Sequence, residues 1–390
     1  MNVYLDNGAT TRLTDSMKRY LTSVLDLWGN PSSLHSMGEE PRQILRNARQ
    51  SVASFLHAEP NEVFFTPSGS GSNTLAVKGL TSENPSEDPY DIFYSPTAHK
   101  SLQDACRSCV HHAPLKVDAV GRIHPEYLED VLTGCRERKP LVCIEAANSE
   151  IGTMNDVAGI GAIVRAHHGT FLVDATGYVP SREVDVRAWR PFVDLLTFSG
   201  HKLHALKGIG VLWKREGLVL KPLIYGSQQD GIIAGTENVL GIASLGKAVT
   251  DHDYASVSSA DRDTVHDYVM ANIPDCYLVG PSTSSGDRLP NNLYLCFRGV
   301  EGEALMLLLD TYGIQVSTGS ACTSGNLTAS AALTAIGMKG DDLHSCIRLS
   351  FGEKLRNAEL SYVCRTLKQC VEALRSLPAR ESVVRNTPHS

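Results

Sequence analysis

The sequence predicts an α/β protein, with a mostly parallel central sheet in a large domain and a smaller α+β domain. Three short apolar runs carry the first part of this prediction, and they span 141–145 (LVCIE), 170–174 (TFLVD) and 194–198 (DLLTF). Polar or turn residues bound each run and helix-compatible sequence separates them, which is typical of βαβ units. Because parallel strands place ligand-binding loops at their carboxyl ends, we expect Asp174 and residues 199–202 to lie at one edge of the sheet.

The smaller domain is predicted from a change in sequence character near residue 256. Helices are expected over 261–273, 301–311, 330–336 and 357–376, and a strand is expected over 292–297. We therefore assign 14–255 to the large domain, and 1–13 together with 256–390 to the small domain. The small domain would carry the loop around Cys322.

Composition limits the classes of function. The chain has 390 residues, of which 42% are hydrophobic, so it can bury a large core. Its formal net charge of −7 argues against a stand-alone nucleic-acid binder, which usually carries a basic patch. No window approaches 18 uninterrupted apolar residues, and the first residues show no secretory signal. We expect a cytoplasmic protein that contacts neither membrane nor nucleic acid directly.

The cysteines give a further limit. There are 10 in the chain, which is too few for a disulfide scaffold of this length. Their spacing contains no paired zinc-binding pattern, so we expect no metal site.

Lys202, in the stretch Ser199-Gly200-His201-Lys202, is the first candidate for chemistry. A lysine forms a Schiff base with an aldehyde cofactor when it is held near the site and partly desolvated. An isolated loop lysine is more often a solvated surface charge. This lysine follows a predicted buried strand, and the hydroxyl and imidazole beside it are suited to binding a phosphate.

Two further segments fit a phosphorylated cofactor. Asp174 ends a predicted strand, where a carboxylate either caps the next loop or pairs with a pyridinium nitrogen. Residues 66–73 (TPSGSGSN) lie between strand-like 62–65 and helix-like 74–80. Small residues at such a turn expose backbone N–H groups and a positive helix end to a phosphate, although many such loops are plain turns.

Cys322 lies within 317–325 (STGSACTSG). A buried structural cysteine is the usual interpretation of a single thiol, but this stretch is too small and polar to be core. A mobile loop would suit a thiolate that must reach a substrate and then move away.

Taken together, these motifs resemble the group I (NifS/IscS-like) cysteine desulfurases, in the class V branch of the pyridoxal-phosphate (PLP)-dependent aminotransferases, fold type I. The resemblance covers nearly the whole chain. Its motifs are, in order, 5–6, 9–11, 29–33, 99–100, 150–152, 173–176, 199–202, 234–238, 300–304, 319–325 and 347–352. Each motif alone is a modest signal, whereas the ordered set is highly specific.

The resemblance implies roles for the matching residues. Lys202 would carry PLP and move the substrate α-proton, Asp174 would pair with the pyridine nitrogen, and His99 would stack on the ring and assist proton transfer. Cys322 would accept sulfur from cysteine, leaving alanine and a persulfide that passes to a separate acceptor protein. Arg348 would bind the substrate carboxylate, a usual task of a guanidinium, with Asn30 as a second substrate-binding residue.

The remaining implied roles concern how PLP is held. The cofactor-binding residues would be Lys202, Asp174, His99, Ser199, His201, Ser70, Gly69, Asn148 and Thr236. In the family a threonine from the neighbouring subunit completes the phosphate site. That residue corresponds to Thr236 and implies a homodimer.

The sequence departs from the family around the cofactor. Gly177 stands where the family has a glutamine, and Ser149 stands where it has an asparagine. Both amides normally donate to the phenolic oxygen of PLP, so a water molecule or Asn148 would have to replace them. In the phosphate loop, Ser70-Gly71 replaces Thr-Glu, and Pro67 and Ile233 replace a serine and an arginine.

These departures favour a divergent desulfurase in a specialised sulfur pathway, such as DNA phosphorothioation or tRNA thiolation, over general iron–sulfur assembly. The alternatives are another PLP reaction on this fold, such as selenocysteine lyase or cystine lyase, and a weakly active docking partner in sulfur transfer.

Overall fold

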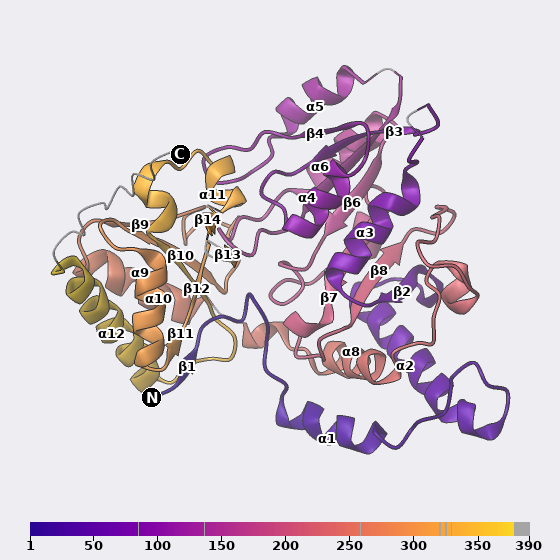
Figure 1. Cartoon of the computed structure of the whole chain (residues 1–390), viewed down its shortest axis with the longest axis horizontal. Helices are drawn as coiled ribbons and strands as arrows, with labels where there is room; N and C mark the ends of the chain where they lie inside the picture. Colours follow the sequence, from indigo (N-terminus) through magenta and orange to yellow (C-terminus); the bar gives the residue numbers. More distant parts are fainter. Residues whose placement is uncertain are drawn as a thin grey trace, which may run out of the picture.

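The computed structural model describes residues 1–377 except 85, 136, 258, 320, 324, 325 and 329, and only the backbone of 321–323 and 326–328. Two sheets, each covered by helices, lie side by side (Figure 1). The fold class is the predicted one. The domain limits at 13/14 and 255/256 remain a prediction.

The larger sheet has seven strands in the order β2-β8-β7-β6-β5-β3-β4. They are β2 (Val63–Thr66), β3 (Tyr90–Tyr94), β4 (His112–Pro114), β5 (Lys139–Glu145), β6 (Thr170–Asp174), β7 (Leu195–Ser199) and β8 (Gly210–Lys214). β8 is antiparallel to both of its neighbours, and the other strands run parallel. β5, β6 and β7 therefore fall on the three predicted apolar runs.

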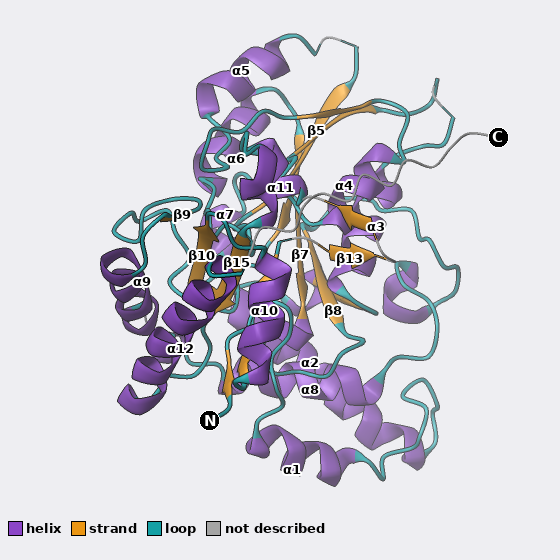
Figure 2. Cartoon of the chain, turned by 60° about the vertical axis from the view of Figure 1, so that its left-hand side comes forward, coloured by secondary structure: helices purple, strands orange, loops and turns teal. Residues whose placement is uncertain are grey.

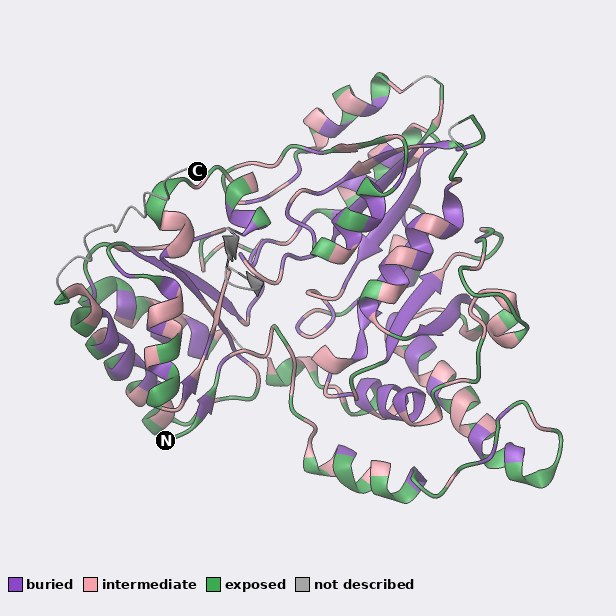
Figure 3. Ribbon diagram, viewed as in Figure 1, coloured by how far each residue is buried: buried purple, intermediate pink, exposed green. Residues whose placement is uncertain are grey.

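Helices cover both faces of this sheet. They are α1 (Asp15–Val24), α2 (Glu39–Leu56), α3 (Gly69–Leu80), α4 (Lys100–Arg107), α5 (Pro125–Thr133), α6 (Val157–Ala166), α7 (Val186–Trp189) and α8 (Val239–Asp251). Short 3₁₀ helices are η1 (Ser36–Gly38), η2 (Pro60–Glu62), η3 (Gly200–Lys202), η4 (Gln228–Gly231) and η5 (Tyr254–Ser256). One face packs on α3 and α4, and the other on α2, α6 and α8. The sheet is buried on both sides, as Figure 3 shows, which explains why its central strands read as continuous apolar runs.

The second sheet is antiparallel, with the order β12-β15-β10-β9. Its strands are β9 (Cys276–Leu278), β10 (Asn292–Phe297), β12 (Ser317–Thr318) and β15 (Cys346–Ser350). Two small pairs accompany it, β1 (Val3–Tyr4) with β11 (Ile314–Gln315) and β13 (Ala321–Thr323) with β14 (Asn326–Thr328). Its helices are α9 (Ala260–Asn272), α10 (Gly302–Thr311), α11 (Ala331–Ala335), α12 (Asn357–Arg375) and the 3₁₀ helix η6 (Gly340–His344).

The first residues of the chain lie in this second unit. Val3 and Leu5 share one buried cluster with Val265, Leu295 and Leu367. Figure 2 shows α9, α10 and α12 beside β10 and β15, with the N-terminus close by. The N-terminal residues therefore pack with the last third of the chain, and the next residues cross to the larger sheet.

Candidate active site

The carboxyl ends of β6 and β7 form the centre of the site. Asp174 is the last residue of β6, Ser199 is the last residue of β7, and Lys202 ends the 3₁₀ helix that follows. The strands are in register with Asp174 opposite Thr197. The structure thus places Asp174 and the 199–202 loop at one sheet edge, where the sequence predicts them.

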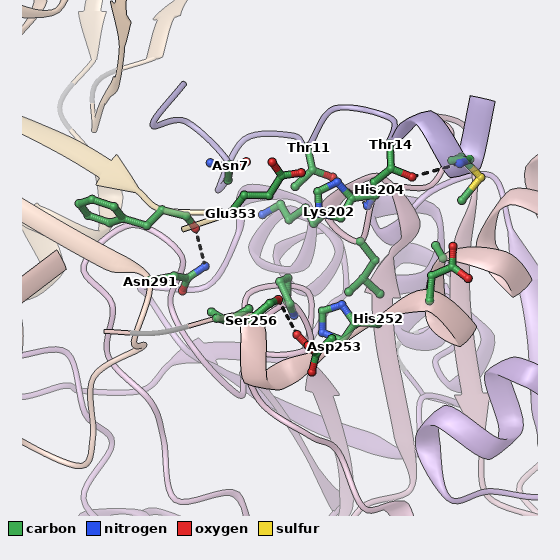
Figure 4. Close-up of a pocket in the computed structure, with 18 of the residues that line it drawn as sticks. Asn7, Thr11, Thr14, Lys202, His204, His252, Asp253, Ser256, Asn291 and Glu353 are labelled. Carbon is green, nitrogen blue, oxygen red and sulfur yellow. Dashed lines mark hydrogen bonds between the residues drawn. The ribbon is translucent and has the colours of Figure 1, made fainter. Parts of the chain in front are cut away.

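Lys202 lies in an environment that disfavours its charged form. Burial and, to a smaller extent, the charge of Arg348 lower the pKa of Lys202 to about 8, although Asp174 and Asp6 act in the opposite direction. Lys202 also borders two cavities, one of about 20 Å³ and one of about 320 Å³. Figure 4 shows Lys202 near Thr11 and Glu353 in the wall of the larger cavity. An amine with a pKa of about 8 is partly uncharged near neutral pH, and the uncharged form can attack an aldehyde.

Asp174 is buried and held in a fixed orientation. Its Oδ2 accepts a hydrogen bond from Asn73 Nδ2 at 2.8 Å, and its Oδ1 accepts one from the backbone N–H of Thr176 at 2.9 Å. Asn73 is held in turn, because its Oδ1 accepts a hydrogen bond from Thr197 Oγ1 at 2.6 Å and its Nδ2 also donates to Ser101 Oγ at 3.1 Å. The orientation of the Asp174 carboxylate is therefore fixed by Asn73 on α3, which is itself held by Thr197 on β7.

His99 begins the helix α4 as its N-cap. Its Nδ1 lies 2.8 Å from Ser101 Oγ and accepts a hydrogen bond from the Ser101 backbone N–H at 3.2 Å. Burial lowers the pKa of His99, Asp174 opposes this shift, and Lys202 adds to it. The ring is therefore neutral at pH 7, with its hydrogen on Nε2, because Nδ1 is the acceptor.

The start of α3 lies against the end of β7. Ser68 caps the helix by accepting a hydrogen bond from the Gly71 N–H at 3.0 Å. A Cβ at Gly69 would stand 3.1 Å from the Cβ of Ser199 and 3.3 Å from Thr176 Oγ1. The helix end is thus close-packed on the sheet edge, and Ser70 beside it is exposed. The Nδ1 of His201 pairs with Thr10 Oγ1 at 3.1 Å, and the role of His201 in phosphate binding remains a prediction.

Arg348, on β15, forms an ion pair within its own unit and a hydrogen bond to the larger one. Its Nη2 lies 2.7 Å from Asp6 Oδ1, and its Nη1 donates to the backbone carbonyl of Ser149 at 3.4 Å. Its Nε is buried and has no hydrogen-bond partner among the described residues. A substrate carboxylate could therefore be bound here by a guanidinium whose donors are only partly used.

Three predicted residues lie outside this cluster of contacts. Asn30 is exposed, and its Oδ1 accepts a hydrogen bond from the Ser32 N–H at 2.8 Å. Thr236 is exposed between η4 and α8. Asn148 is engaged in its own loop: its Nδ2 donates to the Thr97 carbonyl at 2.6 Å and its Oδ1 accepts two backbone N–H groups. Their roles remain predictions.

Cys322 lies in β13, where its backbone pairs with Leu327 of β14. Its side chain is outside the described part of the structure. Its role as the sulfur acceptor is therefore a proposal that depends on the sequence motif and on the described residues at either end of the segment.

Two of the departures from the family pattern, at positions 149 and 177, lie close together in the structure. Ser149 and Gly177 both line the cavity of about 20 Å³ that Lys202 borders. A Cβ at Gly177 would come within 2.5 Å of the Ala147 carbonyl oxygen and 3.3 Å of the Ser149 N–H nitrogen. The backbone of 147–149 thus occupies the space that the Cβ of a glutamine at position 177 would need.

Sequence reasoning missed two residues of this site, Asn73 and Asp6, and one residue beside it, Glu150. Asn73 was seen only as the end of the Gly/Ser loop, although a polar residue inside a helix with buried neighbours was an available signal. Asp6 and Glu150 were read only as parts of motifs. The structure shows that Asp6 pairs with Arg348, and that Glu150 accepts a hydrogen bond from Tyr294 at 3.0 Å.

The residues fit PLP in most respects. Lys202 has an amine with a lowered pKa, Asp174 is a buried and oriented carboxylate, and the N-terminal end of α3 with the exposed Ser70 suits a phosphate. The fit is weaker on the side of Gly177 and Ser149, where the expected amides are absent. Among the described residues, no group of His, Cys, Asp and Glu side chains could hold a metal ion. No described helix is long and apolar enough to cross a membrane.

An α/β transferase fold with a desolvated lysine and a buried acid at its sheet edge defines a class of enzyme, and comparison with known proteins agrees with that class. The profile of the family "Aminotransferase class-V" matches residues 3–363, and the chain belongs to the cysteine desulfurase branch of this generally PLP-dependent family.

Individual relatives support the same assignment. The chain is 36% identical to a cysteine desulfurase of Nostoc sp. over 96% of its length and 94% of the relative. It is also 36% identical to cysteine desulfurase IscS of Dictyoglomus turgidum, with 96% of each chain covered. A solved NifS-like protein covers 97% of the chain with a TM-score of 0.85 and 29% identity. SspA, solved in complex with cysteine, covers 91% with a TM-score of 0.78 and 27% identity.

Proposed function

We propose that this protein is a PLP-dependent cysteine desulfurase that converts L-cysteine to L-alanine and holds the sulfur as a persulfide on Cys322. The observation that carries the proposal is Lys202, whose pKa falls to about 8 beside Asp174 and Arg348. The family of the chain and the names of its relatives support the choice of cysteine as substrate.

PLP, when bound, supplies an electron sink for the substrate. Asp174 keeps a proton on the ring nitrogen, and Asn73 and Thr176 hold the carboxylate in place for this task. Lys202 Nζ takes the substrate α-proton, since its lowered pKa leaves a useful fraction as free amine. His99, neutral with its hydrogen on Nε2, can donate that hydrogen while Ser101 fixes the ring.

Arg348 binds the substrate carboxylate. In the absence of substrate it pairs with Asp6, so binding exchanges one carboxylate partner for another. Because of this exchange, the partly buried guanidinium of Arg348 has a charge partner both before and after the substrate binds. Asp6 therefore prepares Arg348 for the substrate.

Cys322 takes the sulfur. Its thiolate attacks the substrate sulfur, the new sulfur–sulfur bond forms and the carbon–sulfur bond breaks. The carbon then takes a proton, and alanine leaves. A separate acceptor protein receives the persulfide sulfur in this proposal. The altered surroundings of the ring at Gly177 and Ser149 favour a specialised sulfur pathway over general iron–sulfur assembly.

The proposal includes a homodimer in which Thr236 completes the phosphate site of the partner subunit. Its exposure and the left-handed φ of 105° at Gly235 next to it support a segment that reaches outward. Exposed apolar side chains nearby in sequence are Leu223 (46% exposed), Ile224 (60%) and Tyr225 (84%), and a second copy would cover them.

Steady-state release of alanine and sulfide from L-cysteine tests the proposal. Cys322→Ala should abolish the release of sulfide under reducing conditions, whereas Cys135→Ser, a partly buried thiol away from the site, should keep the wild-type rate. A Cys322→Ala variant that releases sulfide as fast as the wild type would instead indicate a lyase reaction. Wild-type protein that binds PLP and does not respond to cysteine would indicate a docking partner.

A further inference from the structure

We propose that Glu150 is a positioning residue that fastens both ends of the segment carrying Cys322 and thereby sets how readily this thiol receives sulfur. The inference rests on the proposed desulfurase function. It concerns described residues on either side of 320–329, namely Gly319 and Ser330, together with Tyr294 and Glu150.

At the first end of the segment, Gly319 packs directly on the Glu150 side chain. A Cβ at Gly319 would overlap the Tyr294 hydroxyl and Glu150 Oε1. The backbone of Gly319 is outside the left-handed region, so space, not conformation, requires the glycine. Tyr294 is fully buried and donates to Glu150 Oε1 at 3.0 Å, which makes this pair a firm support.

At the other end, Ser330 joins the same carboxylate. Its side chain faces Glu150 and helps to lower the pKa of that carboxyl, and its Oγ accepts the Leu333 N–H at 3.2 Å as the N-cap of α11. Because Ser330 is 5% exposed, this contact is shielded from water. Glu150 therefore contacts the two residues that flank the segment, Gly319 and Ser330.

Glu150 is itself rigidly held. Its backbone N–H donates to Asn148 Oδ1 at 2.9 Å, and its carbonyl accepts from Asn292 Nδ2 at 2.9 Å. Burial raises the pKa of Glu150, while the side chains of Ser330 and Tyr294 and the charge of Arg348 lower it.

The same contacts lie beside the substrate-binding arginine. In the second sheet, Arg348 is directly opposite Tyr294 on one side and Ser317 on the other. Glu150 thus lies between two groups of residues. One is the set of paired strand residues Ser317, Arg348 and Tyr294, and the other is the pair that flanks the Cys322 segment, Gly319 and Ser330. Fixing both ends of a ten-residue segment (320–329) restricts where its thiol can be, and misplacement of a reacting group by about 1 Å can cost about 100-fold in rate.

Two reactions separate positioning of the thiol from cofactor chemistry. Exchange of the α-hydrogen of L-alanine in D₂O needs Lys202 and Arg348 but not Cys322. Single-turnover formation of a persulfide on Cys322 needs all three. Glu150→Ala should slow persulfide formation about tenfold or more, and should leave alanine exchange within about twofold of the wild type.

A third measurement does not depend on catalysis. The rate at which iodoacetamide alkylates Cys322 in cofactor-free protein should rise severalfold in Glu150→Ala and less in Glu150→Gln, which keeps one oxygen acceptor. Glu372→Ala, which removes an exposed carboxylate on α12, should match the wild type in all three measurements. Ser330→Ala should act in the same direction, and its effect should be smaller when Glu150 is already alanine.

The outcomes are distinguishable. Wild-type protein that forms no persulfide on Cys322 would refute the proposed function. A wild-type enzyme that forms it, with Glu150→Ala equal in persulfide formation and alkylation, would refute the positioning role alone. Equal losses of exchange and persulfide formation would also refute it, because Glu150 would then act through Arg348. If Glu150→Ala does not fold, the same three measurements on Glu150→Gln and Ser330→Ala test the positioning role.

Discussion

The amine of Lys202 gives the first prediction at the scale of single residues, because its pKa of about 8 lies well below that of an exposed lysine, about 10.4. The lowered pKa means that the free amine becomes the main form above about pH 8. The rate of PLP uptake by cofactor-free protein should therefore rise with pH and level off with a midpoint near 8. Stopped-flow absorbance of the bound cofactor measures this rate.

A variant of Arg348 provides the control for this pH profile. The charge of Arg348 helps to lower the pKa of Lys202, and Asp6 opposes it. Arg348→Gln removes that charge and releases Asp6, so the midpoint should move to higher pH. A midpoint near 10 in the wild type would contradict the desolvated environment of Lys202.

Gly177 gives a second residue-level prediction, on stability. A Cβ there would stand 2.5 Å from the Ala147 carbonyl oxygen, which is backbone and cannot swing aside. Gly177→Ala should lower the free energy of unfolding by about 1–3 kcal/mol. Gly286→Ala is the matched control, since a Cβ at Gly286 meets nothing within 4 Å. Equal urea midpoints for the two variants would show that the loop at 147–149 does not press on position 177.

At the scale of elements, α3 connects its N-terminal end, which would hold the phosphate of PLP, to Asp174, which would pair with the ring nitrogen. Its first residues pack on β7, and one turn further Asn73 donates to Asp174. Asn73→Ala would leave Asp174 with one donor fewer, at a cost of about 1–3 kcal/mol. We expect the dissociation constant of PLP, measured by fluorescence titration, to rise about tenfold or more.

The control for this change is Asn47→Ala on α2, where the amide is exposed and accepts a hydrogen bond from Gln43 Nε2. Asn47→Ala should bind PLP as the wild type does. An unchanged dissociation constant in Asn73→Ala would mean that Thr176 alone is enough to orient Asp174.

The elements also show how far sequence reasoning reaches. The apolar run at 170–174 predicted β6 residue for residue, because a strand buried on both faces leaves a continuous pattern. The Asn73–Asp174 hydrogen bond spans 101 positions in the chain, and no local pattern encodes such a contact. The closure of the 147–149 loop over Gly177 was equally hidden, because the sequence showed only a missing side chain.

At the scale of the whole molecule, the N-terminal residues connect the two units. Leu5 is buried in the second unit, Asp6 pairs with Arg348, and Thr11 Oγ1 donates to the His201 carbonyl at 2.9 Å. The site is thus built from three distant parts of the chain. The resemblance to a known family pointed to Arg348, whereas the pattern of apolar runs predicted the sheet and the edge that holds Asp174 and Lys202.

The proposed homodimer gives a prediction at this scale. Thr236→Ala and Lys202→Ala should each bind PLP poorly or turn over poorly alone. If Thr236 serves the partner's site, a mixture refolded together contains hybrid dimers with one intact site, so desulfurase activity should reappear. Mixtures that stay inactive, or sedimentation as a monomer, would contradict the shared site.

The central claim is that Cys322 carries the sulfur, and mass spectrometry of the peptide containing Cys322 tests it most directly. After a single turnover with L-cysteine, followed by rapid alkylation, this peptide should carry one additional sulfur atom in proportion to the alanine formed. The peptide of Cys135 should carry none. Formation of alanine with no additional sulfur on Cys322 would contradict the account.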